Sequence, residues 1–579
     1  KILDVKFSMN ISQIEIDFGN FFCKSAILTF FFFKSKIKLS TGQGSSELPC
    51  PVFLFSKRKE VITMKKRHGF IAAAVAVSLL AAQTFAGAYY TQDLTFPLQS
   101  SDNETVTGDY YVKSTLDNIS WGFLPNRDSE PILTVPSGST VTFDTVSHEG
   151  ILEDQGRDPV KYFGQYGVSS DMVLDDAKAI AASDDPHDFL ADGPHVVTGP
   201  IAVEGAEPGD VLKVEVLDLA PRVPYGVITN RHFKGALPDE FPEKERLETA
   251  SVENPEAYGD VSVFCPIHQE DGIWYGTVDD NGTEMKFPLS PFLGIMGVAP
   301  DTSEKVSTVP PINVGGNLDI NELGVGATLY LPVEVEGAKF YTGDPHFVQG
   351  DGEVALTALE GSLRGTVRLT LLKAGDSSIP KTSEKFTQAF AETEKYWIPI
   401  GLNEDLDEAM KQSVRESVNF LSNQFNLDRA KVYAYLSAGV DYEVSQVVDK
   451  TKGIHALIPK VDFRDILTLK LNAGSKSIDV GISSNQFYVP LRETMEALGY
   501  TVEWDGATNS IVMTKDGKSV TAVVESNIYN ADGQNIVLTS SPFISEDGVT
   551  MLPVSALSDA AGLSVNWTTS GSVVTGSVQ

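Results

Sequence analysis

Short runs of alternating apolar and polar residues dominate the chain between about residues 93 and 373. Examples are GSTVTFDTV (138–146), GDVLKVEVLDL (209–219), ATLYLPVEVEG (327–337) and GTVRLTLL (365–372). A period of two places every second side chain on one face of a strand, and Asp-Gly, Asn-Gly and Pro-Gly dipeptides between the runs signal turns. No alternation of strands with helices is visible. This region is therefore predicted to be rich in β-structure, with long loops that suit a binding site.

Residues 403–437 change to a helical spacing. In NEDLDEAMKQSVRESVNFL, apolar residues recur every three or four positions, and acidic residues fill the first turn. The pattern predicts a helix capped by Asn403, because an Asn side chain at this position accepts a hydrogen bond from a free backbone N–H. A second helix is predicted to begin near Asp428.

The chain from about residue 467 contains an internal repeat. YVPLRETMEALGYTVEWDGATNSIVM (488–513) aligns with MLPVSALSDAAGLSVNWTTSGSVVTG (551–576), so that Pro490 matches Pro553 and Trp504 matches Trp567. Each copy predicts a short helix after the Pro, a Gly stop and a pair of strands that carries the Trp. This unit resembles the copper amine oxidase N-terminal-like (stalk) domain, which the resemblance associates with secreted proteins of Gram-positive bacteria. It has no His or Cys, so copper is not expected. We expect a structural or cell-surface role, with possible association with the cell wall.

Residues 64–86 have the pattern of a secretory signal peptide. Met64 precedes a basic cluster, an apolar stretch covers about residues 69–82, and Thr84-Phe85-Ala86 predicts cleavage after Ala86. A membrane anchor is the alternative, although the apolar run is short for one. Residues 1–63 are then interpreted as upstream sequence read in frame, with a genuine extension as the alternative. A secreted or cell-surface protein without a membrane span after cleavage is expected.

The chain is thus predicted to have α+β architecture in four segments. These are the upstream segment 1–63, the signal peptide 64–86, a β-rich core with a helical end at 87–466, and the small α+β repeat domain at 467–579. The net charge of −33 argues against nucleic acid and anionic membranes as partners. Cys265 is the only cysteine after residue 86, which leaves no internal disulfide, and we expect it to be a small core residue.

The stretch FYTGDPHFVQGDGEVALTALE (340–360) concentrates residues that bind metals or move protons. The alternation in VALTAL predicts a strand, which would place the preceding polar residues on the loop that leads into it. The stretch contributes Asp344 and His346 as candidate metal ligands and Gln349, Asp351 and Glu353 as candidate catalytic residues. A solvated turn is the alternative interpretation.

Two other segments place His residues beside predicted strands. His148 and Glu149 follow GSTVTFDTV, and His195 precedes a strand. If the segments converge, His148, Glu149, His195, Asp344 and His346 would bind a divalent metal, with zinc favoured and calcium as the alternative. Taken singly, each His is more often a surface or core residue than a ligand.

Three further residues are candidate substrate contacts. Asn317 and Asp319 lie in the glycine-containing loop PPINVGGNLDINEL, and Asn317 could hydrogen-bond an amide; Trp121 could form a wall of the pocket. The alternatives are side chains bonded to their own backbone for the first two, and burial in the core for Trp121.

Several long motifs in order resemble the acetamidase/formamidase family. They are the 340–360 stretch, GPHVVTGPIAVEGAEPGDVLKVEVLDL (193–219), SPFLGIMGVAP (290–300), PPINVGGNLDINEL (310–323), SAGVDYEVSQVVD (437–449) and GIHALIPK (453–460). The resemblance extends from about Trp121 to Phe463. It implies a β-rich α+β fold, hydrolysis of a short aliphatic amide to a carboxylate and ammonia, and a homo-oligomer.

The residues favour one chemical route for such a reaction. No GxSxG nucleophile motif is present, and nothing around Cys265 suggests a nucleophile, so metal-activated water is predicted. The sequence thus predicts a secreted amidohydrolase whose partner is a small-molecule amide such as formamide or acetamide. A non-catalytic secreted or cell-surface binding protein that retains the fold is the alternative, and an amidase for cell-surface or peptide-like amides is a third interpretation.

Overall fold

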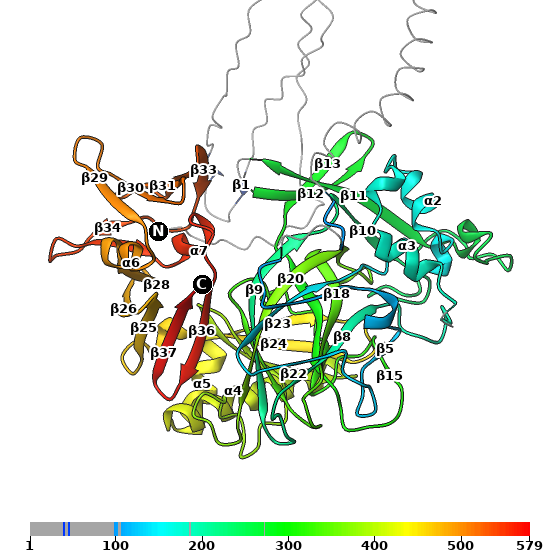
Figure 1. Cartoon of the computed structure of the whole chain (residues 1–579), viewed down its shortest axis with the longest axis horizontal. Coiled ribbons are helices and arrows are strands. Elements are labelled where there is room, and N and C mark those ends of the chain that lie inside the picture. Colours follow the sequence, from blue (N-terminus) through cyan, green and yellow to red (C-terminus); the bar gives the residue numbers. More distant parts are fainter. Residues whose placement is uncertain (1–38, 41–44, 47–97, 102–105, 185–186, 271–272) are drawn as a thin grey trace, which may run out of the picture. The chain divides into compact units, whose positions relative to one another are not determined.

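The computed structural model describes residues 39–40, 45–46, 98–101, 106–184, 187–270 and 273–579. The predicted signal peptide, and all of segment 1–63 except the paired two-residue strands β1 (Leu39–Ser40) and β2 (Ser45–Ser46), lie outside these residues. The described residues from 98 to 579 belong to one compact unit, which is described below (Figure 1).

Eleven strands of the described chain form the larger sheet. The path β13-β12-β11-β10-β19-β18-β14-β16 is antiparallel throughout, and β8 joins it by pairing with β18 while also pairing with β4 and β6. The strands are β4 (Ile119–Trp121), β6 (Leu133–Val135), β8 (Val196–Val203), β10 (Tyr225–Asn230), β11 (Val261–Glu270), β12 (Ile273–Asp280), β13 (Thr283–Pro288), β14 (Phe292–Val298), β16 (Gly315–Asn317), β18 (Phe340–Val348) and β19 (Leu359–Glu360).

Nine described strands form a second sheet in the order β23-β24-β22-β21-β17-β9-β20-β7-β3. They are β3 (Tyr110–Val112), β7 (Ser139–Asp144), β9 (Val211–Pro221), β17 (Thr328–Pro332), β20 (Leu363–Leu372), β21 (Phe390–Glu392), β22 (Tyr396–Asn403), β23 (Asp441–Gln446) and β24 (Lys452–Pro459). A further short pair joins β5 (Phe123–Leu124) to β15 (Val306–Ser307).

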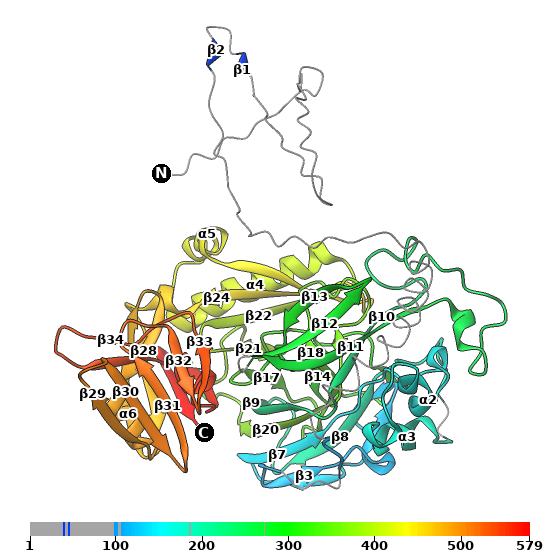
Figure 2. The same ribbon diagram turned by 90° about the horizontal axis from the view of Figure 1, so that it is seen from above.

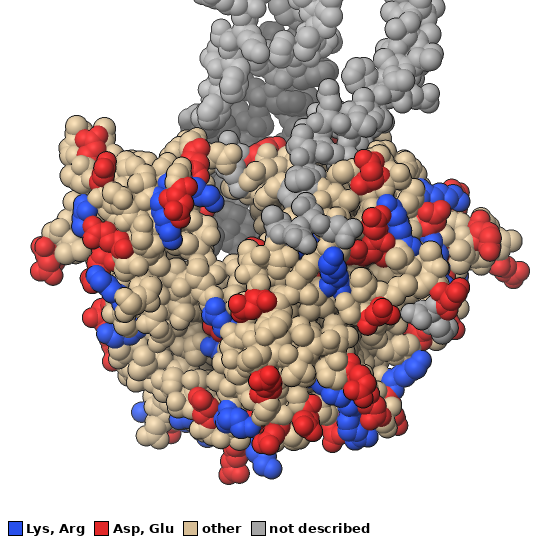
Figure 3. Space-filling view, in the orientation of Figure 1, with Lys and Arg blue, Asp and Glu red and all other residues tan. Residues whose placement is uncertain are grey.

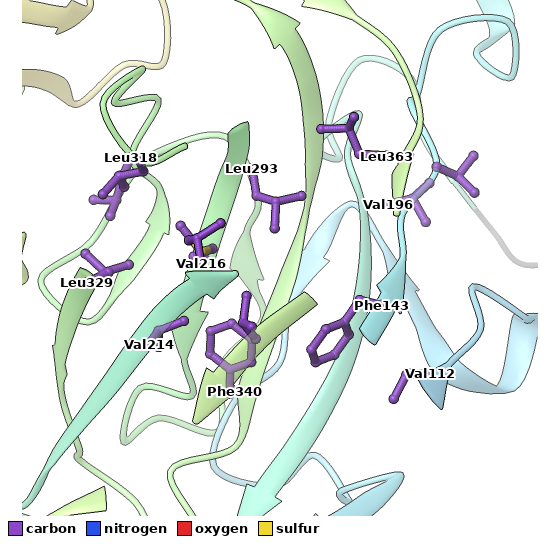
Figure 4. Packing of buried hydrophobic residues seen from close by; sticks show 14 of the residues in the cluster. Val112, Phe143, Val196, Val214, Val216, Leu293, Leu318, Leu329, Phe340 and Leu363 are labelled. Atoms are coloured by element: carbon purple, nitrogen blue, oxygen red, sulfur yellow. The ribbon is translucent and has the colours of Figure 1, made fainter. Parts of the chain in front are cut away.

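One hydrophobic core lies between the two large sheets (Figure 4). Phe143 of the second sheet contacts Phe340 of the larger sheet edge to face, with ring centroids 5.8 Å apart. Burial is nearly complete because each strand turns its alternate apolar side chains inward, as the period of two predicts. The four runs of alternating residues correspond to β7, β9, β17 and β20, which confirms the predicted β-rich α+β class.

Two helices follow β22 and pack on the outer part of the second sheet. Helix α4 (Leu406–Phe425) contacts β22 and β24, and α5 (Arg429–Gly439) follows it (Figure 2). The predicted cap of α4 is wrong by two residues, because the Asp405 carboxylate accepts the free N–H groups of Asp407 and Glu408 while Asn403 accepts from Asp405 N. The prediction for α5 is confirmed, since Asp428 accepts from Lys431 N. The shorter helices α2 (Pro159–Gly164) and α3 (Asp175–Ala181) contact each other near the start of the core.

The C-terminal residues form three small sheets and two short helices. The sheets have the orders β26-β25-β37-β36, β27-β28-β35-β34 and β29-β30-β31-β32-β33. Their strands are β25 (Thr468–Ala473), β26 (Lys476–Asp479), β27 (Gly481–Ser483), β28 (Gln486–Pro490), β29 (Thr501–Asp505), β30 (Ser510–Lys515), β31 (Lys518–Val523), β32 (Ile528–Ala531), β33 (Gln534–Val537), β34 (Phe543–Ile544), β35 (Thr550–Pro553), β36 (Val565–Ser570) and β37 (Val573–Val578). As the repeat predicts, helices α6 (Leu491–Ala497) and α7 (Ser555–Asp559) follow the two prolines, and each precedes a strand pair with a Trp.

The C-terminal sheets are packed onto the core through β36. The Asn566 side chain donates to the carbonyl oxygens of Val216 and Ala327, each at 3.1 Å, and Thr328 Oγ1 donates to Trp567 O at 3.0 Å. The buried Glu392 carboxylate accepts from Thr569 N and Oγ1, at 3.0 and 2.8 Å. Apolar side chains of both segments also belong to one buried cluster, so the repeat segment is joined to the core by buried contacts.

Within the described ranges no helix combines the length and hydrophobicity needed to cross a bilayer. On the face in Figure 3, acidic side chains are interspersed with Lys and Arg.

Candidate metal centre

Neighbouring strands of the larger sheet carry the centre. Asp344 and His346 both lie within β18, two residues apart, and therefore face the same side of the sheet. The prediction that they lie on a loop is wrong. The predicted strand VALTAL (354–359) does not form either, because only its last residue, Leu359, belongs to a strand, β19. Glu360 in β19 is the register partner of His346. The antiparallel pairing thus places an imidazole and two carboxylates together.

His148 and His195 reach the same place from the ends of two other strands. His148 follows β7, and His195 directly precedes β8. His195 Nε2 is 3.6 Å from Asp344 Oδ1, His148 Nδ1 is 3.7 Å from the same oxygen, and the two rings are 5.2 Å apart. One ligand atom of each of the three residues lies within 4.8 Å of the others, and all three side chains are buried. Two imidazoles and a carboxylate match the ligand set of many catalytic zinc sites.

The orientation of His195 suits a metal ligand. Its Nδ1 is 3.1 Å from Thr308 Oγ1, which leaves Nε2 directed toward Asp344. Burial lowers the pKa of His195 to about 4, and His148 and His346 nearby add to this effect. A neutral imidazole with one nitrogen held by a second residue is the form that binds metals.

Asp344 also belongs to a second group of possible ligands. His346 Nε2 is 3.1 Å from both Asp344 Oδ2 and Glu360 Oε1. Three more overlapping sets of ligand atoms therefore extend from the first: Asp319–Asp344–His346, His346–Glu353–Glu360 and Asp319–Glu353–Asp449. Together these eight residues form what we call the His–carboxylate cluster.

Many polar atoms of the cluster have no hydrogen-bond partner although they are buried. They include Asp344 Oδ1, Glu360 Oε2, both oxygens of Asp319 and both ring nitrogens of His148 and His346. His148 Nε2 is 3.2 Å from a Glu149 oxygen but is poorly aligned with it. Unpaired buried polar atoms are costly, and a cation among them would satisfy several at once. The donor set therefore fits a divalent metal.

The carboxylates also need a cation or protons for electrostatic reasons. Burial raises the pKa of Asp319 and of Glu353 well above the usual range. The nearby Glu353 carboxylate raises the pKa of Asp319 further, and the Asp449 carboxylate raises that of Glu353. Burial likewise raises the pKa of Asp449 to about 7. Acids so close together in a dry place cannot all be ionised unless positive charge compensates them.

The backbone is strained at three members of the cluster. Asp319, Asp344 and Glu353 have φ values of 49°, 48° and 46°, in the left-handed region that non-glycine residues seldom adopt. Such strain is often found where function requires a particular side-chain direction. Gly294 in β14 supplies the space beside them, because a methyl group there would lie 2.6 Å from Asp319 Oδ1 and 2.7 Å from Asp344 Oδ2.

Glu149 occupies a different environment from the other predicted ligands. Its carboxylate accepts from Arg231 Nη2 at 2.9 Å, from Thr229 Oγ1 at 2.7 Å and from Gln155 Nε2. Although burial alone would raise the pKa of Glu149, Arg231 and His148 outweigh it and lower the pKa to about 2. The structure therefore pairs this carboxylate with Arg231, and it places Glu149 outside the four ligand groups.

The other predicted residues are distributed over the cavity and its surroundings. Asn317 is buried and lines the cavity, with Nδ2 donating to Val309 O at 3.1 Å and Oδ1 unpaired. Gln349 is buried and donates to Asp319 O and Ser445 O, at 2.9 and 3.0 Å, so it holds the backbone of the cluster. Asp351 is exposed and contacts Asn321. Trp121 stacks on His187 with centroids 4.2 Å apart, behind the cavity wall.

Sequence reasoning missed Asp449 and left Glu360 without an assigned role. Asp449 follows the apolar pair Val447-Val448 within the SAGVDYEVSQVVD motif, which was its only available signal. Its segment reaches the loop that follows β18 through the isolated bridge between Gly352 and Gln446. This pairing of residues 94 positions apart leaves no trace in local periodicity.

The cluster forms the inner end of a cavity of about 380 Å³. The polar residues that line this part of the cavity are His148, His195, Asn317, Asp344, Glu353, Glu360 and Asp449. Segments 187–195, 231–238 and 447–450 contribute to the remaining walls. The cluster is thus accessible to a small molecule.

The β-rich fold and the buried His–carboxylate cluster define a protein with a candidate metal-dependent active site. The sequence profile of the acetamidase/formamidase family matches residues 169–305 and 302–464, about half of the chain. The chain belongs to this family. The profile of the copper amine oxidase N-terminal domain matches residues 477–575.

Individual relatives are more distant. The chain is 29% identical over 213 residues to a formamidase of Methylophilus methylotrophus, covering 31% of this chain and 52% of the relative. It is 29% identical over 202 residues to an acetamidase of Mycolicibacterium smegmatis, covering 28% and 49%. The chain thus spans about half the length of these relatives. A solved acetamidase of Bacillus halodurans is 26% identical, with a TM-score of 0.46 and coverage of 61% of this chain and 99% of the other.

Proposed function

We propose that this protein is an amidohydrolase that cleaves the carbon–nitrogen bond of a linear amide to give a carboxylate and ammonia. Membership of the acetamidase/formamidase family and the names of its relatives support this assignment. The observation that carries it is the His–carboxylate cluster, which places imidazoles and carboxylates with unpaired buried atoms at the inner end of a cavity. A binding protein has no need of so many buried acids in one place.

In the proposed site, His148, His195 and Asp344 hold a divalent cation, with zinc favoured by the two imidazoles. When bound, such a cation supplies the Lewis acidity that polarises an amide carbonyl and activates water. Thr308 keeps the His195 imidazole oriented.

Asn317 is suited to orient the amide. Its Nδ2 donates to a backbone carbonyl, which fixes Oδ1 as the free atom, and this oxygen is buried without a partner on a residue that lines the cavity. An acceptor in this place pairs with the N–H of an amide, whereas it would repel a carboxylate. Asn317 thus favours binding of the substrate over the carboxylate product.

Glu353 is the residue that we assign to proton transfer. It lines the cavity, belongs to two of the ligand groups and has a raised pKa because it is buried near Asp449. A carboxyl group in this position takes the proton of the attacking water and donates it to the leaving nitrogen, which departs as ammonia. Asp319 and Asp449 beside it share the proton.

Removal of metal is expected to abolish the activity. Purified residues 87–579 should contain about one tightly held divalent ion per chain and should release ammonia from amides. Dialysis against a chelator should remove the metal and the activity, and added zinc should restore the metal and the activity. Ammonia release that is unaffected by a chelator, in protein without metal, would contradict the metal-dependent mechanism while leaving the amidase assignment intact. Ammonia release from none of the amides tested would contradict the assignment and favour a binding protein.

Replacement of Cys265 tests the route through a protein nucleophile. Cys265 is buried in β11, lies outside the cavity lining, and has its pKa raised to about 12 by burial. Cys265→Ala is therefore expected to keep full activity per folded molecule, with a loss of stability of about 1 kcal/mol from the smaller side chain. Inactivation of native enzyme by a thiol reagent, prevented by this substitution, would contradict the expectation.

We further propose that the protein acts outside the cell. The signal-peptide pattern of residues 64–86 supports this proposal. Mass spectrometry of protein recovered from the culture medium and from cells should find an N-terminus after Ala86. Peptides from residues 1–63 in the native protein would contradict it.

A further inference from the structure

The cavity is far larger than formamide or acetamide requires. Its volume is about 380 Å³, whereas roughly 10–15 Å³ on the same scale holds a water molecule. Formamide and acetamide are only a few times larger than water. Cavities of roughly 300–1,000 Å³ are typical of ligands with many non-hydrogen atoms. The site therefore has room for a much longer substrate.

The chemical character of the cavity changes from its inner to its outer end. The polar cluster lies buried at the inner end, whereas the apolar Phe189, Leu190, Phe233, Pro238 and Leu356 line other parts of the wall, together with the charged Asp192, Arg231, Lys234 and Lys450. Leu190 and Phe233 are 74% and 75% exposed, which is unusual for apolar side chains of this size. Apolar side chains gathered at the mouth of a cavity are typical of binding sites.

The two exposed apolar residues come from separate segments, one preceding β8 and the other following β10. Both line the same cavity, so an apolar group that extends outward from the cluster would cover both of them. Burial of their surface is favourable in proportion to its area. A short amide held at the cluster would leave them in water.

We infer that the substrate is a primary amide whose acyl group is an apolar chain or ring several carbons larger than acetyl. The inference rests on the proposed amidase function. The carboxamide lies at the cluster and Asn317, and the acyl group extends toward Leu190 and Phe233. Water adds its oxygen to the carbonyl carbon, the carbon–nitrogen bond breaks, and the nitrogen takes a proton, so that one amide and one water give one carboxylate and one ammonium ion.

A series of primary amides from formamide to hexanamide, with phenylacetamide, tests the inference. Ammonia release should give a kcat/KM that increases roughly threefold to fourfold with each added methylene, and therefore about a hundredfold from acetamide to hexanamide. A maximum at formamide or acetamide would overturn the inference and leave the amidase function standing. No ammonia from any member of the series would overturn the proposed function and this inference with it.

Variants at the mouth separate the apolar contact from a general preference for longer amides. Leu190→Ser and Phe233→Ser should each lower the ratio of kcat/KM for hexanamide to that for acetamide by about fivefold or more, because their exposure makes folding insensitive to the change. Met285→Ser is the matched control, since Met285 is 51% exposed on β13 and outside the cavity lining; both rate constants should stay unchanged. An unchanged ratio in both mouth variants would overturn the assignment of the acyl-binding surface.

Discussion

The substitution His195→Ala is expected to remove the metal and nearly all activity. It deletes one of the two imidazoles of the proposed ligand group with Asp344, and it leaves Thr308 without the ring that it orients. Loss of an outer partner of a metal ligand costs about 10- to 100-fold in affinity or activity, so loss of the ligand itself should cost more than that. Metal per chain, measured by elemental analysis, and ammonia release should fall together.

Two further variants distinguish the loss of a metal ligand from unfolding of the protein. His195→Asn keeps a polar side chain in the buried site and should fold, yet it should also lose metal. His268→Ala is a control of the same residue type, because His268 pairs with Glu270 on β11 outside the cavity lining and should keep both metal and activity. Full metal content and full activity in both His195 variants would remove this residue from the centre.

The substitution Trp567→Ala is expected to destabilise the protein by about 3–5 kcal/mol. Trp567 is fully buried in β36, where it packs on Phe487 with centroids 5.4 Å apart. Adjacent residues carry the hydrogen bonds to the core, including Asn566 to Val216 and Ala327. The cavity left by the indole should therefore loosen the contact between the repeat segment and the core. Urea unfolding followed by fluorescence should show a lower midpoint.

The internal repeat supplies the matched control for this variant. Trp504 occupies the corresponding position in the first copy but is 44% exposed. Trp504→Ala should therefore cost less than about 1 kcal/mol. Equal losses of stability in the two variants would contradict the account of the buried contact, because only one of the two indoles leaves a cavity.

Local patterns predicted the parts of the fold that depend on neighbouring residues. The period of two in 209–219 corresponds to β9, and the Asp428 cap to the start of α5. The repeat predicted two helix–strand units, but the two Trp residues have different environments, because Trp567 is buried in β36, which contacts the core, whereas Trp504 is 44% exposed. Periodicity reports which face of an element is buried, but it does not report what covers that face.

The candidate site was predictable only in part. The sequence indicated that His148, His195, Asp344 and His346 would converge, since each stands among glycines and acids beside a strand, and the structure brings all four within the cluster. It gave no means of separating Glu149, which Arg231 engages, from the carboxylates that remain unpaired. That distinction depends on partners 80 or more residues away.

The sequence by itself determined the β-rich class, the helical segment, the repeat and the residue types of a candidate metal site, because local spacing and contiguous motifs specify these features. The tertiary structure alone decided that Asp449 approaches Asp319 and Glu353, that β18 holds Asp344 with a left-handed backbone, and that β36 is packed on the core. It also gave the cavity its apolar mouth. These features arise from the register between distant strands and from the burial of charge, which no run of neighbouring residues specifies.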